Sequence, residues 1–302
     1  MNVSHFLFRR IAPVMLGLAL APMASASGGA FEISQACAVS TGCFPGDSPG
    51  YPVTINAGGA YRLTSNLRVT DAADVGIQVT ASHVDLDLNG FSLSCAEFTP
   101  PFSVTPCSDT QNASGNGIQA LSPVKGLSVR NGTVRDMAAN GLSVHDAQIS
   151  SLTVMGNSRA GILLGGGLVE KSNVYDNQLN GIWTLSASRV AGNVVRDNGG
   201  VGILSGQHSA VIGNVAVGNG LSGISATNSI ISQNSSSENG TSGIFASGGS
   251  VHSNVVDSNS FGLSLGGNAG YRDNTISGNS TDDVTGTGVN LGDNVCGSLL
   301  CP

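Results

Sequence analysis

The chain has 302 residues, of which 40% are hydrophobic and only 10% are charged, and its formal net charge is −7. Charged residues are much scarcer than the roughly 25% of ordinary globular proteins, whereas glycine, with 43 residues, is enriched. An acidic chain without a basic patch argues against nucleic acid as a partner. A large hydrophobic fraction that is arranged periodically argues against a disordered chain.

Residues 1–26 have the pattern of an export signal. Arg9 and Arg10 form a basic start, Ile11–Ala21 is mostly apolar, and Ala24-Ser25-Ala26 is a small-residue cleavage site. We predict a signal peptide that is cleaved after Ala26, and hence a secreted or periplasmic protein. The apolar run is too short for a membrane anchor, and no later run is apolar enough for membrane insertion. Only the arginine pair fits a twin-arginine export signal, and the residues around it do not. The general secretory route is therefore favoured.

From Val129 to Val284 the sequence repeats about every 20 residues, which is a primary signal for fold. One slot, occupied by Met137 in an earlier copy, is filled in later copies by Asn157, Asn177, Asn198, Asn219, Asn239, Asn259 and Asn279. Three columns, mostly apolar, keep a fixed spacing from that slot. Eight residues before it stand Val129, Ile149, Val169, Val190, Val211, Ile231, Val251 and Tyr271. Three before it stand Val134, Val154, Val174, Val195, Ala216, Ser236, Val256 and Ile276. Five after it stand Leu142, Ile162, Ile182, Ile203, Ile224, Ile244 and Val284, with Leu263 displaced by a one-residue deletion.

Three short β-branched segments per copy, separated by Asn, Gly and Ser, predict three strands and three turns. Each segment is too short to be stable alone, so it must stack on its copy in the next coil, about 4.8 Å away. The prediction is an all-β parallel β-helix with three strands and about 20–21 residues per coil. A helical solenoid is disfavoured because no 3.6-residue period runs through a copy.

The recurrence of asparagine at this position has a physical explanation. A turn residue near the left-handed region suits Asn, and identical stacked amides hydrogen-bond to one another along the axis.

The chain is predicted to divide into four parts. After the signal peptide, residues 27–60 form an N-terminal cap, residues 61–284 form the β-helix with regular coils at 129–284, and residues 285–302 form a C-terminal cap. Within an early coil, Val84, Leu86 and Leu88 face the core by alternation. An excursion at residues 91–115 interrupts the coils, and its prolines argue against a central strand there.

Six cysteines form three pairs that are local in sequence: Cys37 with Cys43, Cys95 with Cys107, and Cys296 with Cys301. The compartments outside the cytoplasm are oxidising, so the cysteines of an exported chain form disulfides there, and nearest-neighbour pairing is the simplest connectivity. Zinc binding is the alternative, but neither the spacing nor nearby histidine supports it. The outer two pairs are predicted to pin the end caps, which a solenoid needs to protect its open strand edges.

The segments YRLTSNLRV and VDLDLNGFSLS, followed by repeated VxxNxxxGI units, resemble secreted right-handed parallel β-helix repeat proteins of the pectate-lyase-like superfamily. The resemblance implies a right-handed helix, which parallel crossovers also favour. It implies no single activity, because that superfamily includes lyases, hydrolases, epimerases and adhesins. Polygalacturonase-like enzymes are matched only at Asp282-Asp283, and the Asp-Pro-His-Asp pattern of mannuronan epimerases is absent, so no catalytic residue is carried over.

Candidate catalytic residues flank the asparagine slot in two adjacent coils. Asp176 and Asp197 should place their carboxyl groups about 5 Å apart. Such a pair suits a shared calcium ion or the two carboxyl groups of a glycosidase. Arg196 and Tyr175 beside it suit the binding of an acidic sugar or proton transfer. The alternative is a solvated face whose charges only keep the turn soluble.

Candidate ligand-binding residues are Trp183, Phe245 and Arg135. The position after the Gly-Ile step forms an outward column that includes Leu163, Trp183, Leu204, Ser225 and Phe245. Exposed apolar stripes mark contacts, and a tryptophan stacks well on a sugar ring. The alternative is that the excursion or a second subunit covers the column, which would make the protein an oligomer.

A metal site is less well supported by the sequence. His83, Asp85 and Asp87 alternate on one strand face, but a turn-forming role is favoured because they belong to the pattern of an early coil. The other histidines after the signal occupy different columns. Calcium at Asp176 and Asp197 is therefore the only cofactor hypothesis.

Two classes of function fit these observations. The first is a non-catalytic secreted β-helix that binds glycan or builds a surface. The second is a polysaccharide lyase or glycoside hydrolase that acts on an acidic polysaccharide at an outer face. The missing catalytic signatures favour the first.

Overall fold

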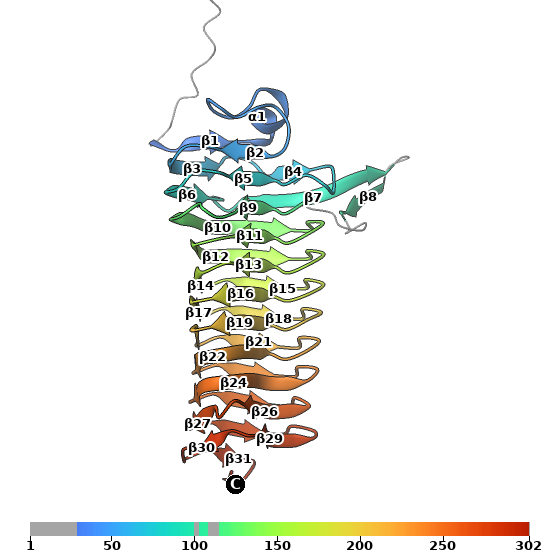
Figure 1. Cartoon of the computed structure of the whole chain (residues 1–302). Coiled ribbons are helices and arrows are strands. Elements are labelled where there is room, and N and C mark those ends of the chain that lie inside the picture. The colour runs from blue at the N-terminus through green and yellow to red at the C-terminus, as the bar shows by residue number, and fades with distance from the viewer. Residues whose placement is uncertain (1–28, 100–102, 108–114, 302) are drawn as a thin grey trace, which may run out of the picture.

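The computed structural model describes residues 29–99, 103–107 and 115–301, so the predicted signal peptide lies outside the described residues. Figure 1 shows these residues as one column of stacked coils, with a short helix at the N-terminal end and a hairpin that projects from the side. The described residues contain no helix of the length and apolarity that crossing a membrane requires.

Each coil contributes one strand to each of three parallel stacks, which we name A, B and C. Stack A contains β2 (Val53–Ile55), β5 (Ile77–Val79), β9 (Ile118–Ala120), β11 (Leu142–Val144), β13 (Ile162–Leu164), β16 (Ile182–Ser186), β19 (Ile203–Gln207), the first parts of β22 (Ile224–Ser232) and β24 (Ser242–His252), β26 (Phe261–Gly266) and β29 (Asp282–Gly286). Stack B contains β1 (Phe31–Ile33), β3 (Gly59–Leu63), β6 (Val84–Asp87), the first parts of β10 (Leu127–Arg135) and β12 (Ala147–Met155), β14 (Gly167–Glu170), β17 (Ser188–Ala191), β20 (Ala210–Ile212), the later parts of β22 and β24, β27 (Gly270–Arg272) and β30 (Val289–Asn290). Stack C contains β4 (Leu67–Val69), β7 (Ser92–Thr99), the later parts of β10 and β12, β15 (Asn173–Tyr175), β18 (Val194–Arg196), β21 (Val215–Val217), β23 (Ser235–Ser237), β25 (Val255–Asp257), β28 (Thr275–Ser277) and β31 (Val295–Cys296).

The predicted apolar columns are the inward-facing positions of these stacks. Ile182 pairs in register with Ile203 in stack A, and both are fully buried. The displaced Leu263 pairs with Ile244, so the one-residue deletion is absorbed in the turn before the strand. The predicted parallel β-helix, with three strands and 20–21 residues per coil, is confirmed.

Stacked asparagine amides hold the turn between stacks C and A. Asn198 is 1% exposed, and its Oδ1 accepts from both the backbone N and the Nδ2 of Asn177, at 3.2 and 2.9 Å. Its own Nδ2 donates to Oδ1 of Asn219 at 3.0 Å and to the carbonyl of Val174 at 3.2 Å. The ladder ends where Nδ2 of Asn279 donates to the Asp283 carboxylate at 2.9 Å. The hydrogen-bonded ladder is therefore confirmed.

The left-handed residue of this turn lies one position earlier than the sequence analysis placed it. None of the seven ladder asparagines has a positive φ. The residue before each ladder position does, with φ between 54° and 66°: Asp136, Gly156, Asp176, Asp197, Gly218, Glu238, Ser258 and Gly278. Because the preceding residue makes the left-handed bend, the asparagine keeps an ordinary backbone and directs its amide inward.

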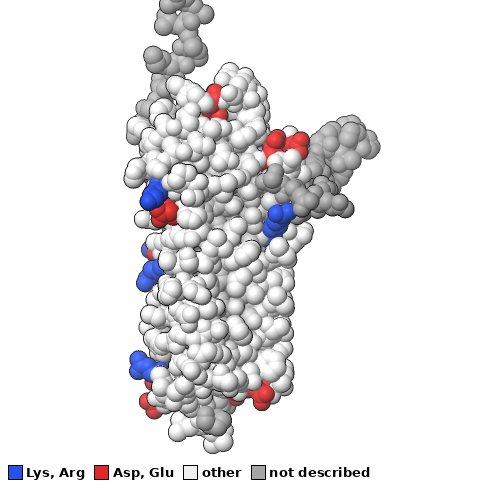
Figure 2. All heavy atoms as spheres, in the orientation of Figure 1, with Lys and Arg blue, Asp and Glu red and all other residues white. Residues whose placement is uncertain are grey.

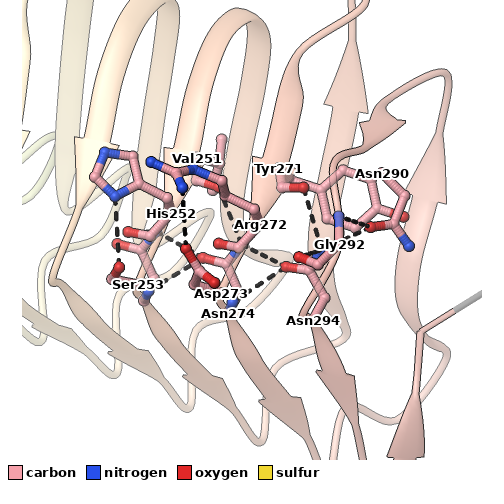
Figure 3. Close-up of polar contacts among 11 residues, drawn as sticks. Val251, His252, Ser253, Tyr271, Arg272, Asp273, Asn274, Asn290, Gly292 and Asn294 are labelled. Atoms are coloured by element: carbon pink, nitrogen blue, oxygen red, sulfur yellow. Dashed lines mark hydrogen bonds and ion pairs between the residues drawn. The ribbon is translucent and has the colours of Figure 1, made fainter.

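A second asparagine ladder, which the sequence analysis missed, holds the turn between stacks B and C. Its members are Asn193, Asn214, Asn234, Asn254, Asn274 and Asn294, all at most 2% exposed. Figure 3 shows its last two steps, where Nδ2 of Asn274 donates to Oδ1 of Asn294 at 2.8 Å and to the carbonyl of Val251 at 3.0 Å. Asn290 ends this ladder by accepting from Nδ2 of Asn294 at 2.9 Å.

The N-terminal end of the core is covered by α1 (Gln35–Ser40). Ser34 caps this helix, since its Oγ accepts from the backbone N of Cys37 at 3.3 Å. The Cys37–Cys43 disulfide closes the loop that follows the helix. Phe44 then packs against Tyr61 with ring centroids 5.1 Å apart, which seals the first coils.

The other end is covered by a hairpin of β31 and β32 (Leu299–Leu300), which the Cys296–Cys301 disulfide closes. The third disulfide, Cys95–Cys107, lies at the base of the excursion. There β7 leaves stack C and pairs in antiparallel fashion with β8 (Ser103–Pro106), outside the three stacks. All three predicted nearest-neighbour disulfides are present, and two of them lie in the end caps.

The stacks extend beyond residues 61–284. β1 and β2 lie within residues 27–60, where they already pair with β3 and β5 of the next coil. At the other end, β30 and β31 lie within residues 285–302 and continue stacks B and C. Both ranges therefore combine capping residues with stacked strands.

Replacing Asn198 with Ala should lower the free energy of unfolding by about 1–3 kcal/mol, because it removes the Oδ1 that accepts from the buried backbone N of Asn177 and the Nδ2 that donates to the carbonyl of Val174 and to Oδ1 of Asn219. Asn173 is exposed on the outer face of stack C and serves as the matched control. Asn173→Ala should change the free energy by no more than about 0.5 kcal/mol. Chemical denaturation measures both, and equal effects of the two substitutions would contradict a stabilising ladder.

Candidate functional site

The outward-facing positions of the three stacks differ in charge. Stack B carries oppositely charged neighbours on successive coils: Glu32, Arg62, Asp87 and Arg130. Stack C carries Arg68, Arg135, Arg196 and Asp257 among uncharged residues. The outward column of stack A contains Thr54, Gln78, Gln119, Ser143, Leu163, Trp183, Leu204, Ser225, Phe245, Ser264 and Thr285. Among the eleven described strands of stack A, no outward residue of this column is charged.

Three of the four candidate catalytic residues are in contact. Tyr175 and Arg196 pair in register in stack C, and the guanidinium carbon of Arg196 lies 4.1 Å from the centre of the Tyr175 ring. The same guanidinium forms an ion pair with Asp197 at 2.6 Å. Both side chains of this ion pair are more than 40% exposed, so the pair contributes at most about 1 kcal/mol to stability.

The fourth residue, Asp176, is exposed at the equivalent turn of the preceding coil. Both aspartates have φ of 54°, which places them at the left-handed position of the turn. Asp, Asn and Gly are the residues that adopt this conformation at least cost. The column of aspartates and glycines therefore has a backbone explanation that requires no catalysis.

Arg135 lies in the same outward column of stack C, separated from Tyr175 by Met155. Its guanidinium is 2.5 Å from the carboxylate of Asp136, the residue at the turn. The Arg196–Asp197 pair repeats this arrangement two coils beyond Met155. Such a repeated pairing of neighbours in sequence is typical of a solvated turn.

Trp183 and Phe245 lie on a different face, in the outward column of stack A. They are 38% and 42% exposed. Leu204 and Ser225 separate them, so they are three coils, or roughly 14 Å, apart. Arg135 therefore does not join them, and the predicted ligand-binding residues divide between two faces.

The Asp85 and Asp87 carboxylates are engaged by Arg130 of the next coil. Arg130 forms an ion pair with Asp85 and a second one with Asp87 at 3.3 Å. The hydrogen bond to Asp85 raises the pKa of Arg130. His83, with φ of 59°, lies at the left-handed position of its turn. Within the described residues, no group of three or more His, Cys, Asp and Glu side chains is placed to hold a metal ion.

The structure also contains a shallow groove that the sequence analysis missed. It runs along the turns between stacks A and B as two hollows of about 520 and 380 Å³, which share Gly167 and Ala187. Its charged side chains are Lys125, Arg189 and Asp146, and His145 and His208 also line it. The sequence marks this turn by a column of serines, Ser188, Ser209 and Ser229, in which the backbone N of one serine donates to Oγ of the next. Each serine directly follows a residue with a positive φ: Ala187, His208 or Asn228.

Solved structures share this architecture at low sequence identity. Pectate lyase Pel9A matches with a TM-score of 0.51 and 13% identity over 86% of this chain and 78% of that chain. The Dettilon tailspike protein matches with a TM-score of 0.51 and 11% identity over 80% of this chain and 59% of that chain. The A-module of mannuronan C-5 epimerase AlgE6 from Azotobacter vinelandii matches with a TM-score of 0.46 and 16% identity over 88% of this chain and 80% of that chain.

A comparison with curated protein sequences finds no match. The family model described as "Right handed beta helix region" matches residues 53–215 and, in an overlapping second match, residues 116–281. These residues include most of stacks A, B and C. The chain therefore belongs to the right-handed β-helix family, as its repeated sequence predicted.

Proposed function

We propose that this chain is an exported, non-catalytic β-helix that binds polysaccharide along stack A. The observation that carries the proposal is the exposure of Trp183, the only tryptophan of the chain, on the outer face of a parallel sheet. An aromatic ring provides a large apolar surface at low conformational cost, which suits the apolar faces of sugar rings.

The scaffold supports a ligand that extends along the solenoid. Leu163 and Leu204 pair in register on either side of Trp183, and Phe245 lies further along the same column. Each of these residues stands on a strand whose inward neighbours are fully buried, so the backbone that carries them is rigid. Sites on regular strands hold their geometry better than sites on loops. The fold itself is shared with a pectate lyase, a protein named for its action on a polysaccharide.

The enzymatic alternative is a lyase or hydrolase of acidic polysaccharide at Tyr175, Asp176, Arg196 and Asp197. Its support is the direct contact of Arg196 with Tyr175. Against it, Arg196 is already paired with Asp197, and the aspartates occupy positions that the turn itself favours. The geometry therefore favours binding, and calcium at this site stays a prediction from the sequence.

Export is part of the proposal. Its support is the signal-like pattern of residues 1–26 and the three disulfides, which form and persist in oxidising compartments. Expression with residues 1–26 present should yield a protein that begins at Ser27. N-terminal sequencing of the exported product checks this, and a product that retains Met1 in the cytoplasm would contradict it.

Titration with a binding polysaccharide should change the fluorescence of Trp183, because no other tryptophan contributes to the signal. Trp183→Ala should weaken binding roughly tenfold or more, as expected for an aromatic contact at the centre of an interface. Isothermal titration calorimetry measures this loss. Val255→Ala is the matched control, since Val255 is 51% exposed but faces outward from stack C. Equal loss in both variants would contradict a site on stack A.

Incubation with uronate-containing polysaccharides, with and without calcium, should release no product from the unmodified protein. Asp176→Ala and Asp197→Ala should leave polysaccharide binding unchanged, because both residues lie outside stack A. Product release by the unmodified protein that disappears in both variants would establish the enzymatic alternative instead.

A further inference from the structure

The outward column of stack A is distinguished by what its polar side chains have in common. Every polar member of the column is an amide or a hydroxyl group: Thr54, Gln78, Gln119, Ser143, Ser225, Ser264 and Thr285. The remaining members are Leu163, Trp183, Leu204 and Phe245. Amides and hydroxyls donate and accept hydrogen bonds without carrying a charge, as the hydroxyl groups of sugars do.

The strands of stack A carry no charged residue except Asp282 and Asp283 of β29, and the ion pairs of the described residues lie on the other faces. Stack B carries the ion pairs of Arg62 with Glu32 and of Arg130 with Asp85 and Asp87. Stack C carries Arg135 and Arg196, each paired with the aspartate that follows it. Figure 2 shows one face of the molecule, most of which is uncharged, with charged side chains mainly toward its edges.

This distribution disfavours an acidic polymer on stack A. Recognition of carboxylate groups uses arginine or lysine, which form charge-assisted hydrogen bonds. The column of stack A offers no such partner, and the chain as a whole is negatively charged. A polyanion on this face would lose hydration of its carboxylates without a cation to replace it.

We propose that the ligand of stack A is an uncharged polysaccharide, which lies along the axis of the solenoid over the column from Leu163 to Phe245. This inference rests on the proposed function and adds the chemical class of the glycan. The aromatic and leucine side chains contact the apolar faces of the sugar rings. Ser225, within this column, and Ser143, before its first leucine, hydrogen-bond to sugar hydroxyl groups.

The groove between stacks A and B provides the internal comparison. Lys125 and Arg189 are exposed there beside one acidic residue, Asp146, so an acidic polymer would be expected in the groove and not on stack A. Binding in the groove should weaken with salt, whereas binding on stack A should change little. Interactions between exposed charges are screened over about 8 Å at physiological ionic strength, whereas apolar contacts and neutral hydrogen bonds are not.

The test measures binding of two neutral polymers, soluble β-glucan and xylan, and of two acidic ones, polygalacturonate and alginate, by calorimetry at low and high sodium chloride. We expect a neutral polymer to bind with a dissociation constant that changes less than about twofold with salt. Trp183→Ala should weaken this binding roughly tenfold or more, and Phe245→Ala should weaken it less. The double variant Lys125→Ala/Arg189→Ala should bind as the unmodified protein does.

Two outcomes would overturn the inference, and they differ in what they mean for the proposed function. Binding of acidic polymers alone, weakened by salt, would overturn the neutral ligand but leave a polysaccharide-binding protein. Binding of none of the four polymers, together with a dimer in analytical ultracentrifugation that Trp183→Ala dissociates, would overturn both, because a second copy would then cover the column. Circular dichroism of each variant shows whether a loss of binding reflects a loss of the fold.

Discussion

The hydrogen bonds between stacked side-chain amides are the interaction on which the rest of the solenoid depends. Each buried asparagine binds the amide of the next coil, as Asn177 binds Asn198, and thereby satisfies backbone groups at a turn that water does not reach. The amides also fix the register of the coils. A shift of one residue would place the inward column of a strand on the outer face. The ladders thus decide which side chains each stack shows to solvent.

A left-handed residue before each ladder position explains much of the unusual composition. Gly156, Gly218 and Gly278 alternate in one such column with Asp136, Asp176, Asp197, Glu238 and Ser258. Aspartates that recur in a turn form a column of carboxylates, which in the sequence suggests a catalytic site. The backbone offers a simpler reason, because this conformation favours glycine, asparagine and aspartate. In this fold a carboxylate becomes evidence for catalysis only when its position is one that the turn does not already favour.

The sequence predicted the regular part of the structure because burial imposes uniformity. The inward columns through Val190 and Ile203 consist almost entirely of β-branched residues, and the first asparagine ladder repeats without interruption from Asn157. The second ladder is as regular as the first from Asn193 to Asn294 and so was open to prediction, although Leu152 and Ser172 occupy its position in the earlier coils. Strands of three residues such as Phe31–Ile33 are too short for a periodic signal. The outward contacts, such as that of Arg196 with Tyr175, depend on side-chain rotamers, which the repeat pattern of the sequence does not specify.

In a solenoid, the side chains that point inward provide stability, and those that point outward are available for function. The inward columns must be uniform, since each coil packs only on its neighbours, whereas the outward columns are free to differ from one stack to the next. Here stack B uses that freedom for ion pairs between coils, and stack C for arginines paired with the adjacent turn. Both patterns keep a repetitive surface soluble and discourage contacts with other chains. Stack A lacks these charges and exposes Trp183 and Phe245 instead. Because exposed aromatic residues without nearby charges add nothing to solubility, this face is where a ligand contact best explains the sequence.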